Sequence, residues 1–395
     1  MRDSLLHWRP SPVLPDDVIF QILLRLPVRS LLKLKRVCKS WKTLISDPCF
    51  AKCHLQSLTM NPSISHQHLF SSKRLLLNHD HIVSLPVESL FENLSQPTKS
   101  VSFRMKRFFR NLLSSNNGSF KDSLKPTKAV EFDLDHSFTI FGSCNGLLCL
   151  FDRDHGCFRL WNPLIRLISK KSPTLGCYEY TTYGGFGYDH VSDKYKVLVG
   201  FNIFTNGIRK SMTKIYTFGE NSLKTIPNFP FPDIWWDGKF VSGTLNWVML
   251  KMGVSSSQNA IISFDLEKEN YKELLLPEHD GINVSIPTLC VSDNRLYVCF
   301  DENKTHLALW LMKTYGVAES WTKLMMIPHE DPVHHLLQLN EPVLIFEDRI
   351  VLIRTEEKFV LYNFNNGRVD SPWISSDNYL YKQHVYNESL VSPLL

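Results

Sequence analysis

Residues 142–149 read GSCNGLLC, in which Asn145-Gly146 separates two apolar runs. Asn and Gly tolerate a positive φ, so this dipeptide predicts a hairpin turn between paired strands rather than a ligand-binding loop. A further strand-like run ends in LWNP at residues 160–163. The stretch therefore predicts neighbouring strands joined by tight turns.

The same arrangement recurs along the chain, with starts near Gly142, Gly184, Asp237, Pro287 and Pro342. The intervals of about 40–55 residues suit four-stranded propeller blades. Within each unit, one strand-like run is followed by a second run that ends in a polar turn and often a proline. We therefore expect a mainly β fold whose body is a β-propeller.

Two apolar, strand-compatible segments, 69–90 and 379–395, lie outside these five units. Pairing them in one sheet would form a sixth blade, close the ring and remove exposed strand edges. We expect six blades, with seven as the alternative.

Residues 95–128 are rich in Ser, Asn and Lys, and they predict a flexible insertion. Eight Lys or Arg stand there against one acid. Basic and aromatic residues alternate between 103 and 110, a composition that can bind nucleic acid or an acidic membrane, but that also suits a solvated loop or one that folds on a partner. We expect no stable nucleic-acid or membrane partner.

The N-terminal segment has helical periodicity instead. Between residues 14 and 47, apolar residues recur at helical spacing in two runs. Asp16 and Asp17 follow Pro15, as acids do in the first turn of a helix, and Pro27 interrupts the pattern. The segment predicts a helical hairpin or a three-helix unit.

Such a unit of about thirty residues buries too little apolar surface to be stable alone. Its remaining apolar side chains must therefore pack on a partner protein, or on the downstream domain as a cap. Six Lys or Arg and no acid occur between residues 28 and 46. Periodicity alone does not separate docking from capping.

The order and spacing of the apolar residues resemble the F-box, on Leu14-Pro15, Ile22-Leu23, Leu26-Pro27, Leu31, VCKSW at 37–41 and Leu44-Ile45. The resemblance implies docking on a Skp-type adaptor, whose acidic surface would suit the basic residues, and through it on a cullin and a RING protein. The implied adaptor-binding or core positions are Leu14, Pro15, Ile22, Leu26, Pro27, Leu31, Val37 and Trp41. At Trp41, an aromatic in a helical stripe favours the core.

Most of residues 66–395 is similar to the F-box-associated domain of plant F-box proteins, a kelch-like family. The motifs are GSCNGLLC, LWNP, GFGYD at 185–189 with YKV at 195–197, FVSG at 240–243 with Trp247, and LWLM at 309–312 through YGV at 315–317 to Trp321. The resemblance implies a kelch-like propeller, although the paired glycines and Trp of kelch blades are not regular here.

Target binding on a propeller usually falls to loops on one face, because loops vary without disturbing the core. Exposed Tyr and Trp are favoured at protein interfaces. The candidate target-binding residues are Tyr178, Tyr180, Tyr183, Trp235 and Trp236. Packing inside the propeller is the alternative for each.

We expect no cofactor, no metal and no catalytic residue. Neither a CxxC pair nor a GxSxG motif occurs, and Gly185-x-Gly187 lacks the third glycine of a dinucleotide loop. That glycine pair is expected at a strand edge. Four cysteines in apolar runs predict buried, reduced thiols: Cys144, Cys149, Cys290 and Cys299.

The composition, 43% apolar and 21% charged, is that of a folded globular protein. An apolar run long enough for a membrane span or a signal peptide is not found, which favours the cytoplasm or nucleus. We expect a helical F-box domain at residues 10–55 and a propeller domain at 66–395.

The expected function is that of the non-catalytic substrate-recognition subunit of an SCF-type cullin-RING ubiquitin ligase, which binds an unidentified protein target. The alternative is a propeller-fold enzyme or glycan-binding module whose helical segment is a structural cap.

Overall fold

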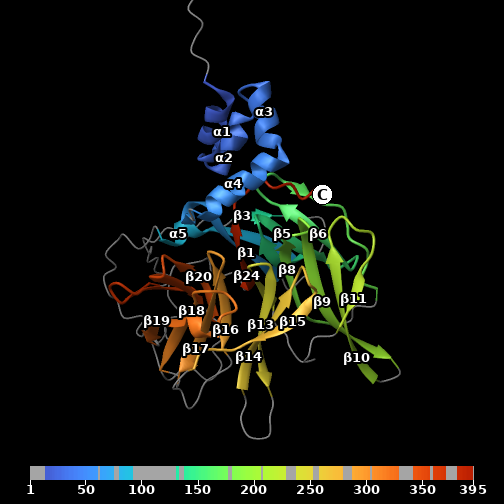
Figure 1. Cartoon of the computed structure of the whole chain (residues 1–395), viewed down its shortest axis with the longest axis vertical. Helices are drawn as coiled ribbons and strands as arrows, with labels where there is room; N and C mark the ends of the chain where they lie inside the picture. The colour runs from blue at the N-terminus through green and yellow to red at the C-terminus, as the bar shows by residue number, and fades with distance from the viewer. Residues whose placement is uncertain are drawn as a thin grey trace, which may run out of the picture.

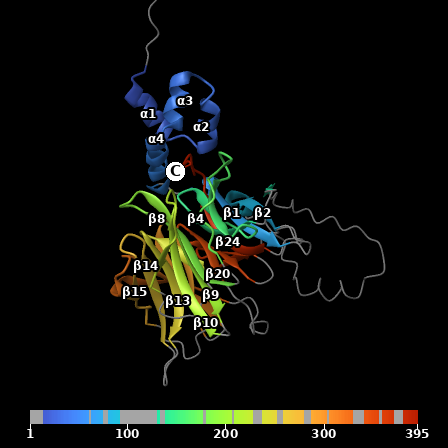
Figure 2. The ribbon, with the colours of Figure 1, turned by 90° about the vertical axis from the view of Figure 1, so that its right-hand side faces the viewer.

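The computed structural model describes residues 14–60, 63–74, 80–91, 130–132, 138–176, 180–205, 208–227, 237–251, 258–278, 287–302, 305–328, 341–355, 359–370 and 380–394. Four helices stand on one end of a body of strands (Figures 1 and 2). We call the helices Asp16–Met60 the helical unit and the strand body the propeller. The expected insertion at 95–128 lies outside the described residues.

The helical unit consists of α1 (Asp16–Leu24), α2 (Val28–Leu34), α3 (Lys39–Ser46) and α4 (Pro48–Met60). Pro15 and Pro27 stand immediately before α1 and α2, where a proline does not interrupt the helical hydrogen bonds. Asp16 and Asp17 occupy the first turn of α1, near the positive end of the helix dipole.

Helix α4 continues to Met60, beyond the expected limit at residue 55. The Asp47 carboxylate begins the helix, because its Oδ1 accepts hydrogen bonds from the backbone N–H groups of Cys49 (2.7 Å) and Phe50 (3.2 Å). Pro48 takes the first helical position. This start signal is present in the sequence, and the helix is long because Phe50 and Leu55 bury an apolar face.

The described strands form six four-stranded blades, each ordered from its innermost strand outward. Blade 1 contains β4 (Phe138–Cys144), β5 (Leu147–Asp152), β6 (Cys157–Asn162) and β7 (Leu167–Ile168); blade 2 contains β8 (Tyr180–Asp189), β9 (Lys194–Thr205), β10 (Ile208–Thr217) and β11 (Lys224–Ile226). Blade 3 contains β12 (Asp237–Val241), β13 (Thr244–Lys251), β14 (Gln258–Asp265) and β15 (Asn270–Leu274); blade 4 contains β16 (Thr288–Ser292), β17 (Arg295–Glu302), β18 (His306–Met312) and β19 (Trp321–Pro328). Blade 5 contains β20 (Glu341–Phe346), β21 (Ile350–Arg354), β22 (Phe359–Asn363) and β23 (Arg368–Asp370); blade 6 contains β24 (Leu380–Asn387), β1 (Gln67–Arg74), β2 (Asp80–Pro86) and β3 (Val130–Phe132). Short helices accompany them at Ile64–His66, Val87–Phe91 and Ala318–Ser320.

Blade 6 closes the ring with strands from both ends of the chain. The last strand, β24, pairs antiparallel with β1, and Phe70 lies opposite His384. Tyr386 of β24 is 1% exposed, and its hydroxyl donates to Asn162 Oδ1 (2.9 Å) in blade 1. The expected pairing of the two end segments in a sixth blade is confirmed.

The two faces of the propeller differ in their connections. In blades 1 to 5 the innermost strand turns tightly into the next strand at one face, which we call the turn face. The outermost strand of each of these blades ends, and the innermost strand of the following blade begins, at the opposite, distal face. Residues with positive φ make these turns at Asn145-Gly146, Ser242-Gly243, Asp293-Asn294 and Glu347-Asp348. Both central residues are left-handed in each case, as type I′ hairpins require. The hairpin predicted at Asn145-Gly146 is confirmed.

The expectation of a strand-edge glycine pair is wrong. Strand β8 is interior to an eight-stranded sheet that joins blades 2 and 3, because Gly184 and Gly185 pair in parallel with Asp237 and Gly238 of β12. A Cβ atom at Gly184 would lie 2.1 Å from the Phe141 ring, and one at Gly187 would lie 2.3 Å from the Phe240 ring. These glycines therefore allow blades 1, 2 and 3 to approach closely at the axis.

The four cysteines expected to be buried thiols are buried and form no disulfide: Cys144, Cys149, Cys290 and Cys299. Burial raises the pKa of each thiol. They act as small apolar core residues.

Replacing Tyr386 by alanine is expected to lower the free energy of unfolding by about 3–5 kcal/mol, because a large buried ring leaves a cavity at the closure. Urea denaturation measures the loss. Phe364, which is 48% exposed, provides the control, and Phe364→Ala should change stability by less than about 0.5 kcal/mol. Equal effects of the two changes would contradict the closure role of Tyr386.

Candidate functional site

The helical unit rests on the turn face of the propeller (Figure 2). Leu390, just after β24, is buried in the apolar core of the helical unit together with Leu31 and Phe50. Leu164 and Ile165, in the turn between β6 and β7, pack against the same core. The helical unit therefore completes its core with side chains from blade 1 and from the C-terminal segment.

Glu388 is the polar centre of this junction. Its side chain is 2% exposed, and its Oε1 lies 2.6 Å from Arg29 Nε on α2 and 3.1 Å from His68 Nε2 on β1. Its backbone N–H donates to the carbonyl of His66 (2.8 Å). Burial acts to raise the pKa of Glu388, but the contacts with His68 and Arg29 outweigh it and hold the pKa below its usual range. One carboxylate thus joins α2, β1 and the C-terminal segment.

A second ion pair joins α4 to the turn between β8 and β9, where Lys52 contacts Asp193. The Tyr188 hydroxyl donates to the same carboxylate. Lys52 and Asp193 are each half exposed, so this pair contributes at most about 1 kcal/mol. It orients the contact more than it stabilises it.

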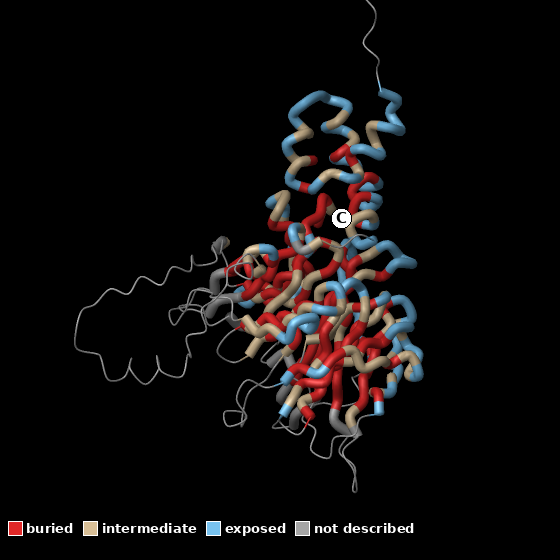
Figure 3. Tube along the Cα trace, turned by 90° about the vertical axis from the view of Figure 1, so that its left-hand side faces the viewer, coloured by how far each residue is buried: buried red, intermediate tan, exposed pale blue. Residues whose placement is uncertain are grey.

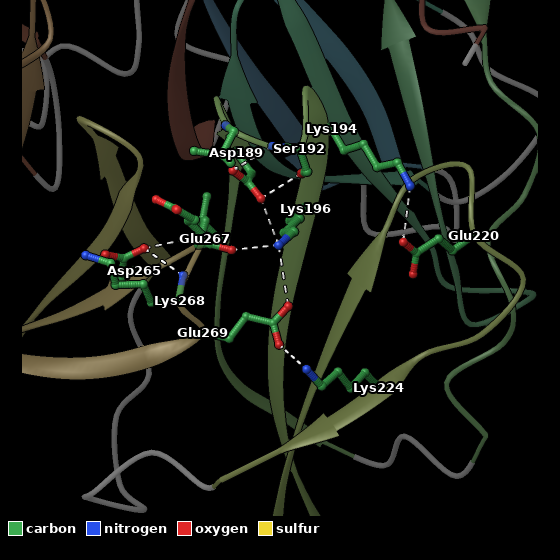
Figure 4. A network of polar contacts seen from close by, with 12 residues as sticks. Asp189, Ser192, Lys194, Lys196, Glu220, Lys224, Asp265, Glu267, Lys268 and Glu269 are labelled. Atoms are coloured by element: carbon green, nitrogen blue, oxygen red, sulfur yellow. Dashed lines mark hydrogen bonds and ion pairs between the residues drawn. The ribbon is translucent and has the colours of Figure 1, made fainter.

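A buried polar network fixes the base of that turn (Figure 4). Asp189, 3% exposed, accepts a hydrogen bond from Ser192 Oγ (2.6 Å) and lies 3.0 Å from Lys196 Nζ. Lys196 also donates to the carbonyl of Leu266 in blade 3 (2.7 Å). Burial acts to raise the pKa of Asp189, yet these hydrogen bonds lower it to about 2. The network holds blades 2 and 3 together beside the helical unit.

The part of the helical unit farthest from the propeller is rich in exposed residues (Figure 3). Leu14, just before α1, and Val18 and Ile22 on α1 follow one another at four-residue spacing and are 53%, 41% and 46% exposed. Val37, between α2 and α3, is 62% exposed. We call these four residues the docking set. Three exposed apolar side chains at helical spacing make this part of the helical unit a candidate interaction surface, unlike a single exposed apolar residue.

The predicted adaptor-binding residues divide into three groups. Leu14, Pro15, Ile22, Pro27 and Val37 are exposed. Leu26 and Trp41 are half-buried and pack against the core of the helical unit. For Trp41, this agrees with the core position that its place in the helical stripe favours.

The prediction that Leu31 contacts the adaptor is corrected by the structure, which places Leu31 in the core. Its exposure is 0%, because it packs with Leu23, Ile45 and Phe50 inside the helical unit. Its place in the apolar stripe reflects the core, not a contact surface.

Exposed basic side chains are frequent in the segment that contains the docking set. Arg25, Arg36, Lys39 and Lys42 are exposed, and so are the acids Asp16 and Asp17. Burial lowers the pKa of Lys35, which is half-buried. The exposed charge of the helical unit is therefore mainly positive between residues 25 and 42, which suits an acidic partner.

The candidate target-binding aromatics are only partly described. Tyr178, Trp235 and Trp236 lie outside the described residues, and Tyr180 is described as the first residue of β8 but not in its side chain. The prediction that Tyr183 binds the target is wrong. Tyr183 is 6% exposed, packs against Trp247 and forms a hydrogen bond between its hydroxyl and Thr213. Its position within an innermost strand explains the burial.

The propeller axis holds a cavity of about 70 Å³, which we call the axial cavity and whose lining is partly polar and partly apolar. Its wall comes from β12, β13, β16, β20 and β24, and includes Asp237, Lys239, Thr288, Glu341 and His384. Asp237, Thr288 and Glu341 are the first residues of their innermost strands. The cavity therefore lies at the distal end of the axis, away from the helical unit.

An ion pair crosses the axial cavity between blades 3 and 5. Lys239 Nζ lies 3.0 Å from Glu341 Oε1, and Arg354 Nη2 lies 3.1 Å from Glu341 Oε2. Burial acts to raise the pKa of Glu341, but Lys239 and Arg354 outweigh it and keep the carboxyl group ionised. A carboxyl group that acts as a general acid needs a raised pKa, whereas that of Glu341 is lowered, so this carboxylate is suited to binding.

Sequence reasoning missed the groups that make the junction and the axial cavity: Arg29 with Glu388, and Lys239 with Glu341. No motif marks them, and each pair joins strands or helices far apart in the chain. The one local signal, a charged residue within an apolar segment near the C-terminus, is present at Glu388.

Comparison with known proteins matches two parts of the chain. The signature of the F-box domain matches residues 12–53, and that of the F-box associated beta propeller domain matches residues 98–393. Strands β1 and β2 of blade 6 precede the second match.

Curated relatives are similar over nearly the whole chain. The F-box/kelch-repeat protein At3g23880 of Arabidopsis thaliana is 30% identical over 397 residues, 96% of each chain. The F-box protein CPR1 of the same organism is 24% identical, covering 96% of this chain and 88% of its own. The F-box protein At3g07870, also from that plant, is 26% identical over 85% of this chain and 77% of its own.

Glu388→Gln is expected to remove part of the acid dependence of stability. A carboxylate with a lowered pKa stabilises the fold above its unfolded pKa, and this stabilisation is lost as the pH falls through the lower, folded value. Thermal unfolding between neutral pH and the acid range measures it. Glu220→Gln, at a half-exposed carboxylate, should retain the parent acid dependence; an unchanged acid dependence in Glu388→Gln would contradict the role of the junction.

Proposed function

The chain belongs to the F-box proteins that carry an F-box associated beta propeller domain, and we propose that it is the substrate-recognition subunit of an SCF-type cullin-RING ubiquitin ligase. In this proposal, the helical unit docks on a Skp-type adaptor, and through it on the cullin and RING protein. The propeller captures a protein target and brings its lysines near the ubiquitin-conjugating enzyme. The chain itself contributes proximity rather than a catalytic group.

The observation that carries the proposal is the exposure of the docking set, whose four apolar side chains are 41–62% exposed although they belong to the helical unit. A structural cap would bury its apolar residues against the domain that it covers. Here Leu390, Leu164 and Ile165 cover one side only, and Val37 stays 62% exposed. A second polypeptide is therefore the natural partner for the open side.

The junction supports the proposal in a second way. Apolar packing around Leu390 and the buried Glu388 contacts hold the helical unit in one orientation on the turn face. A ligase receptor benefits from this, because a target held at a fixed distance reaches the conjugating enzyme more often than one on a loose tether.

The rival proposal, a propeller-fold enzyme or glycan-binding module, has less support. The axial cavity would be its natural site, but Glu341 there is already paired with Lys239 and Arg354. We also place the protein in the cytoplasm or nucleus, where such ligases act. Among the described residues, every helix is too short or too polar to cross a membrane.

The double variant Ile22→Asp/Val37→Asp is expected to lose adaptor binding by about a hundredfold or more, because two carboxylates would replace apolar contacts and face an acidic partner. Coexpression with a Skp-type adaptor, followed by copurification and calorimetric titration, measures the loss. Both side chains are exposed, so folding should be retained.

Val191→Asp is the matched control, since Val191 is 71% exposed in the β8–β9 turn of the propeller. It should copurify with the adaptor as the parent chain does. If the double variant copurified with the adaptor as well as the parent chain does, the proposed docking role of these residues would be contradicted.

The same double variant provides a search for the target. A receptor that binds its target but not the ligase should protect that target from degradation. Proximity labelling in plant cells should therefore enrich a protein that accumulates with the double variant and declines with the parent chain. Identical labelled sets with equal abundance would count against target capture for ubiquitination.

A further inference from the structure

The axial cavity is a site that docking on an adaptor does not use, and charged side chains lie in its wall beside apolar ones. It lies at the distal end of the axis, and the helical unit occupies the turn face. A target bound there would not compete with the helical unit for space. The distal face is also where the connections between blades begin and end.

The Lys239–Glu341 pair offers both kinds of hydrogen-bonding group to a ligand. Each side chain is about one quarter exposed, at 29% and 26%. An ammonium group has three N–H donors, and the contact with Glu341 uses one of them. A carboxylate has about four acceptor positions, and Lys239 and Arg354 occupy two of those of Glu341.

The charges at the cavity balance. Asp237, Glu341 and Lys239 line the cavity, and Arg354, which lies outside the lining, pairs with Glu341. An incoming carboxylate would be repelled by Asp237 and Glu341, and an incoming ammonium by the two cations. A neutral group with an acceptor and a donor side by side meets neither penalty.

A carboxamide is such a group, because its oxygen accepts and its NH₂ donates. One water needs roughly 10–15 Å³ of this kind of space, so 70 Å³ admits the few heavy atoms of a carboxamide. Two carboxamides of the chain itself, Asn246 and Gln383, belong to the wall of the cavity and not to the space that it encloses. Asn246 is engaged there, since its Nδ2 donates to the Lys239 carbonyl (3.2 Å) and its Oδ1 accepts from Tyr315 (2.7 Å).

We propose that the axial cavity is a recognition subsite for the captured protein, and that it takes the carboxamide of an Asn or Gln side chain, with the oxygen toward Lys239 and the NH₂ toward Glu341. This inference rests on the proposed function for its biological meaning. Its chemistry stands on the cavity alone.

The test uses four amino acids blocked as Nα-acetyl N′-methylamides, so that only the side chain can supply a primary carboxamide: those of asparagine, glutamine, aspartate and lysine. Each is titrated into the 395-residue chain while the methyl NMR signals of Val248 and Leu289, which line the cavity, are followed. The two carboxamide probes should shift these signals with millimolar affinity, and the two charged probes should bind at least about tenfold more weakly. Comparing the affinities of the asparagine and glutamine probes shows which of the two side chains fits the cavity better.

Lys239→Met should weaken carboxamide binding by at least about tenfold, because the oxygen loses its donor. Lys194→Met is the matched control, as Lys194 forms a half-exposed ion pair on the turn face, and it should bind like the parent chain. If Lys239→Met fails to fold, the selectivity series on the parent chain decides the question by itself.

The proposal is overturned if no probe shifts the cavity methyl signals, if a charged probe binds as tightly as the carboxamides, or if a folded Lys239→Met variant binds unchanged. Adaptor copurification of the same preparations reports on the proposed function separately. If the chain did not copurify with the adaptor but still bound carboxamides selectively, the proposed ligase function would be contradicted and the proposed subsite would stand.

Discussion

The pairing of β24 with β1 is the interaction on which the rest of the structure depends. It places the end of the chain innermost in blade 6, where Tyr386 packs against Phe70 with ring centroids 5.2 Å apart. The same segment then leaves the ring at the turn face and delivers Glu388 and Leu390 to the helical unit. Ring closure and attachment of the helical unit therefore both use the C-terminal segment.

This arrangement separates two tasks on opposite faces of one rigid body. Tight left-handed hairpins such as Ser242-Gly243 and Asp293-Asn294 leave little length for variation at the turn face, where the helical unit sits. The distal face carries the axial cavity and the connections between blades. A receptor built this way can change its target through the distal face without altering the surface that it shows to an adaptor.

The local parts of the fold were predictable because their signals lie within a few residues. The hairpin at Asn145-Gly146 needs two residues that tolerate a positive φ, and the blade repeat needs only strand-length apolar runs between turns. The start of α4 at Asp47-Pro48 was also legible. The binding assignments were wrong at Leu31 and Tyr183. A Leu or a Tyr occurs both in protein cores and at binding surfaces, and in this fold both side chains are buried.

The sequence by itself determined the mainly β body, its five repeated units, the expectation that its two ends join in a sixth, and an apolar helical segment that resembles an F-box, because propensity, periodicity and turn chemistry are local. Tertiary structure alone decided which apolar side chains stay open, as Val37 does, and which charges meet, as Arg29 meets Glu388 and Lys239 meets Glu341. Those contacts join residues about one hundred or more positions apart, and the physical reason is that only the closed ring sets the distances between blades on which they depend.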